Sequence, residues 1–225
     1  MKGGGMEEYD TGMILRRTGE MVRLAPRATL IFWLALALPT TALAVLPGGG
    51  GDARFAFVGG IVSIFGQFIV SGRVARRAGL MQADDVPGRA GSYALLSIVS
   101  GLAILLGIFL LVLPGLYLLA RWSIAVPIVI AEGKGMGAAL GASWTRTRGR
   151  AVPICLAFLV VGTGLVVSAV LDLFLMPEYG PAPLVPALAS NLLAYASTVL
   201  TWFLAMAIYS FSAREAAPQL EQIFA

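Results

Sequence analysis

The stretch Leu110–Arg150 reads LLVLPGLYLLARWSIAVPIVIAEGKGMGAALGASWTRTRGR, and it decides what kind of fold the chain adopts. Two apolar runs meet at the turn Pro114-Gly115, and the second run carries a single arginine, Arg121. Apolar runs of this length with so few charges are typical of helices that cross a membrane. The last part, Gly135–Arg150, is too polar to span a bilayer and indicates an amphipathic helix at its surface.

The composition of the whole chain agrees with this interpretation. Hydrophobic residues make up 58% of the 225 residues and charged residues 12%. Soluble domains carry about a quarter charged residues. A soluble fold of this length would have no core large enough for so many apolar side chains. We therefore expect an all-α fold, a polytopic bundle of transmembrane helices.

Six apolar runs predict six membrane spans, accompanied by basic amphipathic helices at the membrane surface. The spans cover residues 28–46, 55–72, 92–113, 116–131, 151–171 and 188–212. The transmembrane domain then covers 28–213, after a disordered segment, 1–10, and an interfacial helix, 11–27, and before a cytoplasmic tail, 214–225. The first run also resembles a signal peptide cleaved after Ala44, but it is long enough to span, so we expect it to be retained.

The positions of Lys and Arg predict which side of the membrane each loop faces. With six spans, both termini and the loops 73–91 and 132–150 share one side. These segments hold almost all of the basic residues, whereas the opposite side holds only Arg54. Basic loops stay in the cytoplasm, so we expect both termini to be cytoplasmic. The basic loops also account for the net charge of +4, so this charge does not indicate a nucleic-acid partner, and none is expected.

Residues 11–27 predict a basic amphipathic helix. Arg16, Glu20, Arg23 and Arg27 recur at helical spacing on one side, and apolar residues such as Ile14 lie on the other. Such a helix suits the headgroup region of a membrane, with its apolar side turned toward the acyl chains. Binding to a protein partner is the alternative, but the helix leads directly into a span, which favours the membrane surface.

Arg121 needs a physical explanation because it lies about six residues inside the predicted fourth span. A charged side chain within the membrane is costly and normally has a partner. Three explanations are open: its side chain reaches the outer headgroups, it pairs with Asp172 at the outer end of the fifth span, or it binds an anionic lipid or substrate head.

The residue types that most catalytic sites need are missing from the sequence. The chain has no histidine and one cysteine, Cys155, so imidazole acid–base catalysis and His- or Cys-ligated metal sites are excluded. The carboxylates at the membrane edge, Glu132, Asp172 and Glu178, form no recognisable acid–base pair. We therefore expect no enzymatic activity, no cofactor and no bound metal.

Several motif elements follow one another within Leu110–Arg150. They are Leu113-Pro114-Gly115-Leu116-Tyr117, Arg121-Trp122, Ala125-Val126-Pro127, Glu132-Gly133, Ala139-Leu140, Ser143-Trp144, Thr147 and Arg148-Gly149-Arg150. This order resembles the signature of the glycerophosphodiester phosphodiesterase membrane-domain family and its YciC-like relatives. The segment Ile14–Thr18 is similar too. The resemblance implies a six-helix protein of the bacterial inner membrane, and where such a module is fused to a phosphodiesterase domain, the catalytic residues lie in that other domain.

Two functional hypotheses follow. In the first, the chain is a non-catalytic module that binds or organises lipid, or supports the cell envelope, by contact with anionic headgroups. In the second, it is a transporter-like subunit with a polar path along Arg121, Gln67 and Asn191, or the membrane component of a complex with a protein partner or a second copy. The candidate lipid- or partner-binding residues are Arg16, Arg17, Arg23, Arg121, Glu132, Trp144, Arg146, Arg148, Arg150 and Asp172.

Overall fold

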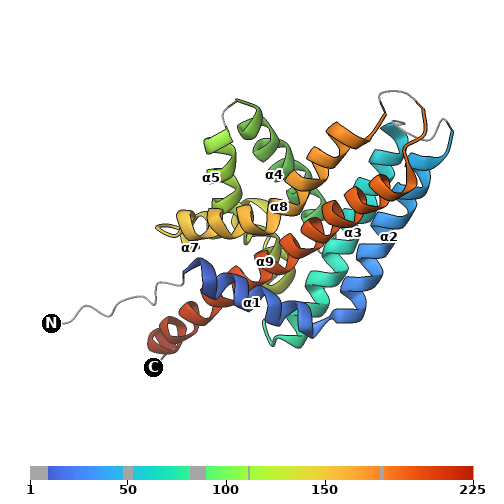
Figure 1. Cartoon of the computed structure of the whole chain (residues 1–225). Coiled ribbons are helices and arrows are strands. Elements are labelled where there is room, and N and C mark those ends of the chain that lie inside the picture. The colour runs from blue at the N-terminus through green and yellow to red at the C-terminus, as the bar shows by residue number, and fades with distance from the viewer. Residues whose placement is uncertain (1–9, 48–52, 82–89, 111, 178–179, 225) are drawn as a thin grey trace.

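The computed structural model describes residues 10–47, 53–81, 90–110, 112–177 and 180–224, and its regular secondary structure there is entirely α-helical (Figure 1). The helices are α1 (Thr11–Leu24), α2 (Pro26–Val45), α3 (Ala53–Arg77), α4 (Ala90–Leu110), α5 (Val112–Trp122), α6 (Ala125–Glu132), α7 (Met136–Arg146), α8 (Ala151–Leu175) and α9 (Leu184–Phe224). The prediction of an all-α fold is therefore confirmed. Residues 1–9, 48–52, 82–89, 111, 178–179 and 225 lie outside the described residues, and Glu178 is among them.

Four stretches of the described chain are long and apolar enough to cross a membrane. They are Pro26–Val45, Leu113–Glu132, Ala151–Leu175 and Leu184–Arg214. They correspond to the predicted first, fourth, fifth and sixth spans. The predicted second span lies in α3, and the predicted third lies in α4, where the apolar segment Gly91–Ile104 is shorter. The chain is thus a multi-pass membrane protein by its helices, while six spans and the side of the termini stay predictions.

The long helix α9 organises the bundle. It packs against α8, α2, α1, α3 and α6, and in Figure 1 it runs diagonally through the molecule. The contact with α8 is close because Gly164 has no side chain: a Cβ there would lie 2.3 Å from Ser197 Oγ. Polar side chains also join the helices, since Trp33 Nε1 donates to Leu192 O at 2.9 Å. Small residues and such hydrogen bonds are the usual means of packing helices in membranes.

The predicted fourth span is not one continuous helix. Pro127 has no N–H to donate, and its ring would clash with the carbonyl group four residues earlier in a continuous helix. The helix accordingly breaks: α5 ends at Trp122, and α6 begins at Ala125. At the other end of α6, Gly133 adopts a left-handed conformation with φ 68°, which favours glycine, and its N–H donates to Val129 O.

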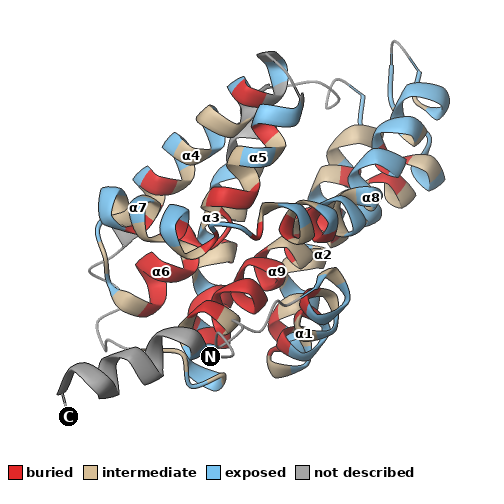
Figure 2. Cartoon of the chain, turned by 90° about the vertical axis from the view of Figure 1, so that its left-hand side faces the viewer, coloured by how far each residue is buried: buried red, intermediate tan, exposed pale blue. Residues whose placement is uncertain are grey.

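The short helix α6 lies at the centre of the protein. Six of its eight residues are buried, and they pack with side chains of α4, α8 and α9, including Leu96, Ile154 and Leu204. Figure 2 shows the buried residues concentrated in α6 and in the middle of α9. Lipid therefore contacts little of α6, although its apolar composition had predicted that it forms the second half of the fourth membrane span.

Candidate functional site

The break between α5 and α6 creates the attachment point of α7. The carbonyl oxygen of Arg121 lies at the end of α5, where a helix runs out of backbone donors. Two hydroxyl groups supply the missing donors. Ser143 Oγ of α7 donates to this oxygen at 2.8 Å, and Oγ1 of Thr147, the C-cap of α7, lies 3.1 Å from it. The amphipathic helix is thereby fixed to the broken span.

The side chain of Arg121 lies among aromatic rings. It is only 2% exposed, and its guanidinium carbon lies 4.4 Å from the ring centroid of Trp144 and 5.9 Å from that of Tyr117. These rings meet edge to face at 88°. Cation–π contacts of this kind stabilise a desolvated guanidinium. Its Nε has no hydrogen-bond partner among the described residues.

The predicted ion pair between Arg121 and Asp172 is not formed. The Sγ atom of Cys155 donates to Leu116 O at 3.4 Å, so α5 lies beside the first turns of α8. Asp172 lies 17 residues further along α8, roughly 25 Å at the rise of a helix, and it is exposed. The prediction placed Arg121 level with the far end of α8, whereas α5 contacts the near end of that helix.

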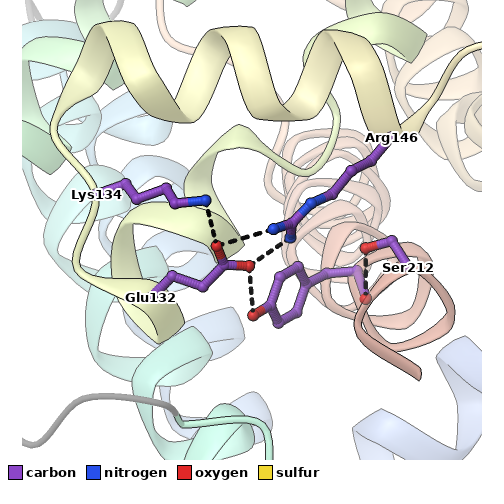
Figure 3. A network of polar contacts seen from close by, with 5 residues as sticks. Glu132, Lys134, Arg146 and Ser212 are labelled. Atoms are coloured by element: carbon purple, nitrogen blue, oxygen red, sulfur yellow. Dashed lines mark hydrogen bonds and ion pairs between the residues drawn. The ribbon is translucent and has the colours of Figure 1, made fainter. Parts of the chain in front are cut away.

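Glu132, the last residue of α6, gathers the charged groups around it. Arg146 contacts it with both terminal nitrogens, Nη1 to Oε1 and Nη2 to Oε2, the latter at 3.0 Å. Lys134 Nζ lies 2.9 Å from Oε2, and Tyr209 of α9 donates to Oε1 at 3.0 Å. Figure 3 shows Lys134 and Arg146 converging on Glu132 from either side. One carboxylate therefore ties α6 to α7 and to α9.

The Glu132 carboxylate is buried more deeply than the two cations that contact it. The Glu132 side chain is 5% exposed, against 24% for Arg146 and 40% for Lys134. Burial alone would lower the pKa of Arg146, but the hydrogen bonds and charge of Glu132 outweigh it and raise that pKa. Two-pronged Arg–carboxylate contacts are among the stronger hydrogen-bonded pairs in proteins.

These contacts together form what we term the α5–α7 clasp, made of Arg121, Glu132, Ser143, Trp144 and Arg146. Four of these residues belong to the motif quoted above, and Arg146 lies within the same stretch. Their described contacts connect α5, α6, α7 and α9 to one another. The motif thus marks a structural unit in which Arg121 and Glu132 contact other residues of the protein.

A second group of arginines lies at the elbow between α1 and α2. Arg27, Arg73 and Arg77 line a recess of about 350 Å³ together with Ala25, Pro26, Ala28 and Ile31. All three arginines are exposed. Arg77 Nη1 donates to the backbone oxygen of Leu24, and no carboxylate of the described residues pairs with any of the three. We call this site the arginine recess.

The other predicted candidates lie apart from one another. Arg16 and Arg23 are exposed on α1, and Arg148 is exposed after α7. Arg17 pairs with Glu20 at 2.6 Å, and this hydrogen bond lowers the pKa of Glu20. Arg150 is buried and engaged within the protein. The structure brings together Arg121, Glu132, Trp144 and Arg146 only.

The sequence patterns did not indicate the arginine recess. Arg27 and Arg73 counted toward the charge of their loops, but nothing placed them side by side. The available signal was that Arg27 directly follows Pro26, which starts α2, while Arg73 and Arg77 end α3, so both groups fall at the predicted cytoplasmic level.

These observations define a helical integral membrane protein whose charged residues gather at one end of its spans. The model of the family described as the membrane domain of glycerophosphoryl diester phosphodiesterase matches residues 95–215, more than half of the chain. The protein belongs to this family, and the match concerns the membrane domain, not the catalytic one. Neither the curated proteins nor the solved structures gave a match.

Within the described residues, no group of three or more His, Cys, Asp or Glu side chains could hold a metal ion.

Proposed function

We propose that the protein is a non-catalytic membrane module that binds anionic lipid headgroups through the arginine recess. The supporting observation is the recess itself: three guanidinium groups surround about 350 Å³, and none is paired with a described carboxylate. Guanidinium groups bind phosphate with paired, charge-assisted hydrogen bonds. A phosphate is therefore the group that best matches this lining.

The surroundings of the recess favour a lipid over a soluble anion. Ile31 lines the recess and, like Leu30 beside it, is an exposed apolar residue of α2. A headgroup held by the arginines would leave its acyl chains along this apolar surface. In this proposal, this end of the helices faces the cytoplasmic side of a bacterial inner membrane, where anionic lipids attract basic residues, and the excess of Lys and Arg in these loops supports it.

The clasp is less suited to bind lipid. Arg146 and Lys134 already share Glu132, and Arg121 is buried beneath Trp144. In this proposal the clasp fixes the helices, while the exposed Arg16 and Arg23 of α1 add long-range attraction. Each basic residue near an anionic surface contributes about 1 kcal/mol.

A transporter-like role is a second candidate, favoured by the break in the fourth span. Broken helices at a polar cavity are typical of transporter binding sites, and Gln67 does line a cavity beside the break. The proposed path is not continuous, however. Asn191 donates to Thr41 and to the backbone of its own helix, and Arg121 stacks on Trp144.

Native mass spectrometry of the full chain, purified in mild detergent, tests the lipid proposal. The protein is titrated with phosphatidylglycerol and, in parallel, with phosphatidylcholine. We expect the wild type to prefer phosphatidylglycerol. Each substitution Arg27→Gln, Arg73→Gln or Arg77→Gln should weaken phosphatidylglycerol binding about fivefold, the equivalent of about 1 kcal/mol.

Arg76→Gln is the matched control, since Arg76 is an exposed arginine of the same helix turn that does not line the recess. Equal losses for Arg76→Gln and Arg77→Gln would show a diffuse charge effect and would contradict a defined site. Retention of a protein partner or a second copy in place of lipid would favour the complex-forming alternative.

A further inference from the structure

A second cavity, partly open to the surface, lies next to the break between α5 and α6. Its volume is about 190 Å³, and α3, α4, α5, α6, α8 and α9 contribute to its lining. Five of its lining residues are polar and uncharged: Gln67, Ser97, Ser100, Ser123 and Thr201. The rest are glycine or apolar residues, so no charged side chain lines it. We call it the break cavity.

The hydroxyl groups of the break cavity are mainly hydrogen-bond acceptors toward a ligand. Ser100, Ser123 and Thr201 each donate their proton to a carbonyl group of the preceding turn, at 2.6–2.8 Å. A hydroxyl that donates in this way keeps its oxygen lone pairs free to accept. Three acceptors from three different segments therefore face one small volume.

Two further side chains offer donors. The oxygen of the Gln67 amide accepts from Tyr93 at 3.0 Å, and the amide still carries two N–H donors. The buried Oγ of Ser97 makes no well-aligned hydrogen bond among the described residues, and the polar group beside it is the phenol of Tyr93. A buried hydroxyl group without a well-formed hydrogen bond is costly. A ligand that offers Ser97 a better acceptor would remove that cost.

We propose that the break cavity binds an uncharged, hydroxyl-bearing group about the size of glycerol. Hydroxyl groups both donate and accept, so they match three acceptors combined with the donors of Gln67 and Ser97. The volume equals that of about six water molecules at ~30 Å³ each. A charged ligand does not fit, because no lining residue compensates a charge in this low-dielectric setting.

Such a group has two possible sources, a free polyol or the glycerol end of a neutral lipid. Gly101 lines the cavity and is exposed on α4, beside the exposed apolar residues Ile98 and Leu102. A lipid could therefore place its hydroxyl end in the cavity and its chains along α4. This proposal does not depend on the arginine recess, which recognises the opposite kind of headgroup.

The test is thermal unfolding of the full chain in a polyoxyethylene detergent, which has no sugar headgroup. The probes are glycerol, 1,2-dioctanoylglycerol, dioctanoylphosphatidylglycerol and dodecane. A ligand that binds only the folded state raises Tm, by about 5 °C at a concentration 100 times its Kd. We expect this rise with glycerol if the source is a polyol, or with dioctanoylglycerol alone if it is a lipid.

Gly101→Leu should abolish the rise, since a Cβ at Gly101 meets no heavy atom within 4 Å and the larger side chain occupies the cavity. Gly162→Leu is the matched control, because Gly162 is equally open and does not line the cavity. Ser97→Ala should reduce the rise without lowering the Tm of the free protein, which keeps the test valid if Gly101→Leu fails to fold.

Three results would overturn the proposal. The first is an equal response of the wild type and both cavity variants to glycerol and to dioctanoylglycerol. The second is an equal or larger rise with dodecane, which would mean an apolar cavity. The third is a rise with dioctanoylphosphatidylglycerol that Gly101→Leu removes, since a charged headgroup would then occupy the site. Loss of the recess arginines should leave the response to the neutral probes unchanged.

Discussion

The α5–α7 clasp and the arginine recess use the same residue type in opposite ways. In the clasp, Glu132 lies between Arg146 and Lys134 and is 5% exposed. In the recess, Arg27, Arg73 and Arg77 are exposed, and the described partner of Arg77 is a backbone oxygen. The difference is the carboxylate: its presence turns arginines into links between helices, and its absence leaves them available to an external anion.

This comparison also explains why a list of basic residues is a poor guide to function in a membrane protein. Arg77 ends α3 and Arg146 ends α7, and a further arginine lies within two residues of each in the sequence. Only the position of Glu132, fixed by the C-cap at Gly133, distinguishes them. Paired and unpaired arginines should therefore respond differently to substitution.

The largest expected effect on stability comes from Glu132→Gln, which leaves Arg146 and Lys134 without their counter-charge. Removing one partner of a buried pair is strongly destabilising, but both cations are partly exposed and solvent screens them. We expect a loss of about 2 kcal/mol, seen as a fall in Tm of roughly 4–8 °C in detergent. Asp172→Asn is the control, because Asp172 is exposed, and it should be nearly silent. A Tm of Glu132→Gln equal to that of Asp172→Asn would refute the role of the carboxylate.

A smaller effect is expected within the clasp, between Arg121 and Trp144. A double-mutant cycle with Arg121→Leu and Trp144→Leu should give a coupling energy of about 1 kcal/mol, from the cation–π contact at 4.4 Å. The same cycle with Arg121→Leu and Asp172→Leu should be additive within about 0.5 kcal/mol. Coupling of Arg121 to Asp172, with no coupling to Trp144, would contradict the contact between Arg121 and Trp144 and favour the ion pair with Asp172.

Cysteine substitutions test the predicted topology by labelling, a readout separate from the stability effects above. On a Cys155→Ser background, Gly137→Cys lies beside the clasp on α7, and Gly180→Cys lies before α9. A membrane-impermeant maleimide should reach position 180 from outside and position 137 only from inside. Labelling of position 137 from outside would place the clasp on the outer side of the membrane and would contradict the six-span prediction.

Sequence patterns predicted the class of the protein and most helices, since apolar runs act locally. The turn expected at Pro114-Gly115 was wrong, because both residues lie in the first turn of α5. The patterns could not predict the partner of Arg121. The prediction placed Arg121 near Asp172, whereas α5 packs against the start of α8, and the turns between α5 and α7 bring Trp144 over Arg121. The need for a partner was correctly inferred, and the partner depended on tertiary structure.

The arginine recess was harder still to predict. It joins Arg27 to Arg73 and Arg77, which are separated by a whole helical hairpin. No periodicity connects residues so far apart, and their proximity depends on α1, α2 and α3 packing together. The break cavity is similar, since its polar side chains come singly from several helices and each looks like an ordinary residue of a membrane span.

The most direct test of the division between clasp and recess measures two properties on the same preparations. Tm and phosphatidylglycerol binding are determined for Glu132→Gln and for the double variant Arg73→Gln/Arg77→Gln. We expect Glu132→Gln to lower Tm and to keep its lipid affinity at temperatures where it is folded. The double variant should keep its Tm within about 2 °C and bind the lipid about 25-fold more weakly, the product of two fivefold losses. Unchanged lipid binding by the double variant, or equal lipid loss in Glu132→Gln, would contradict the account.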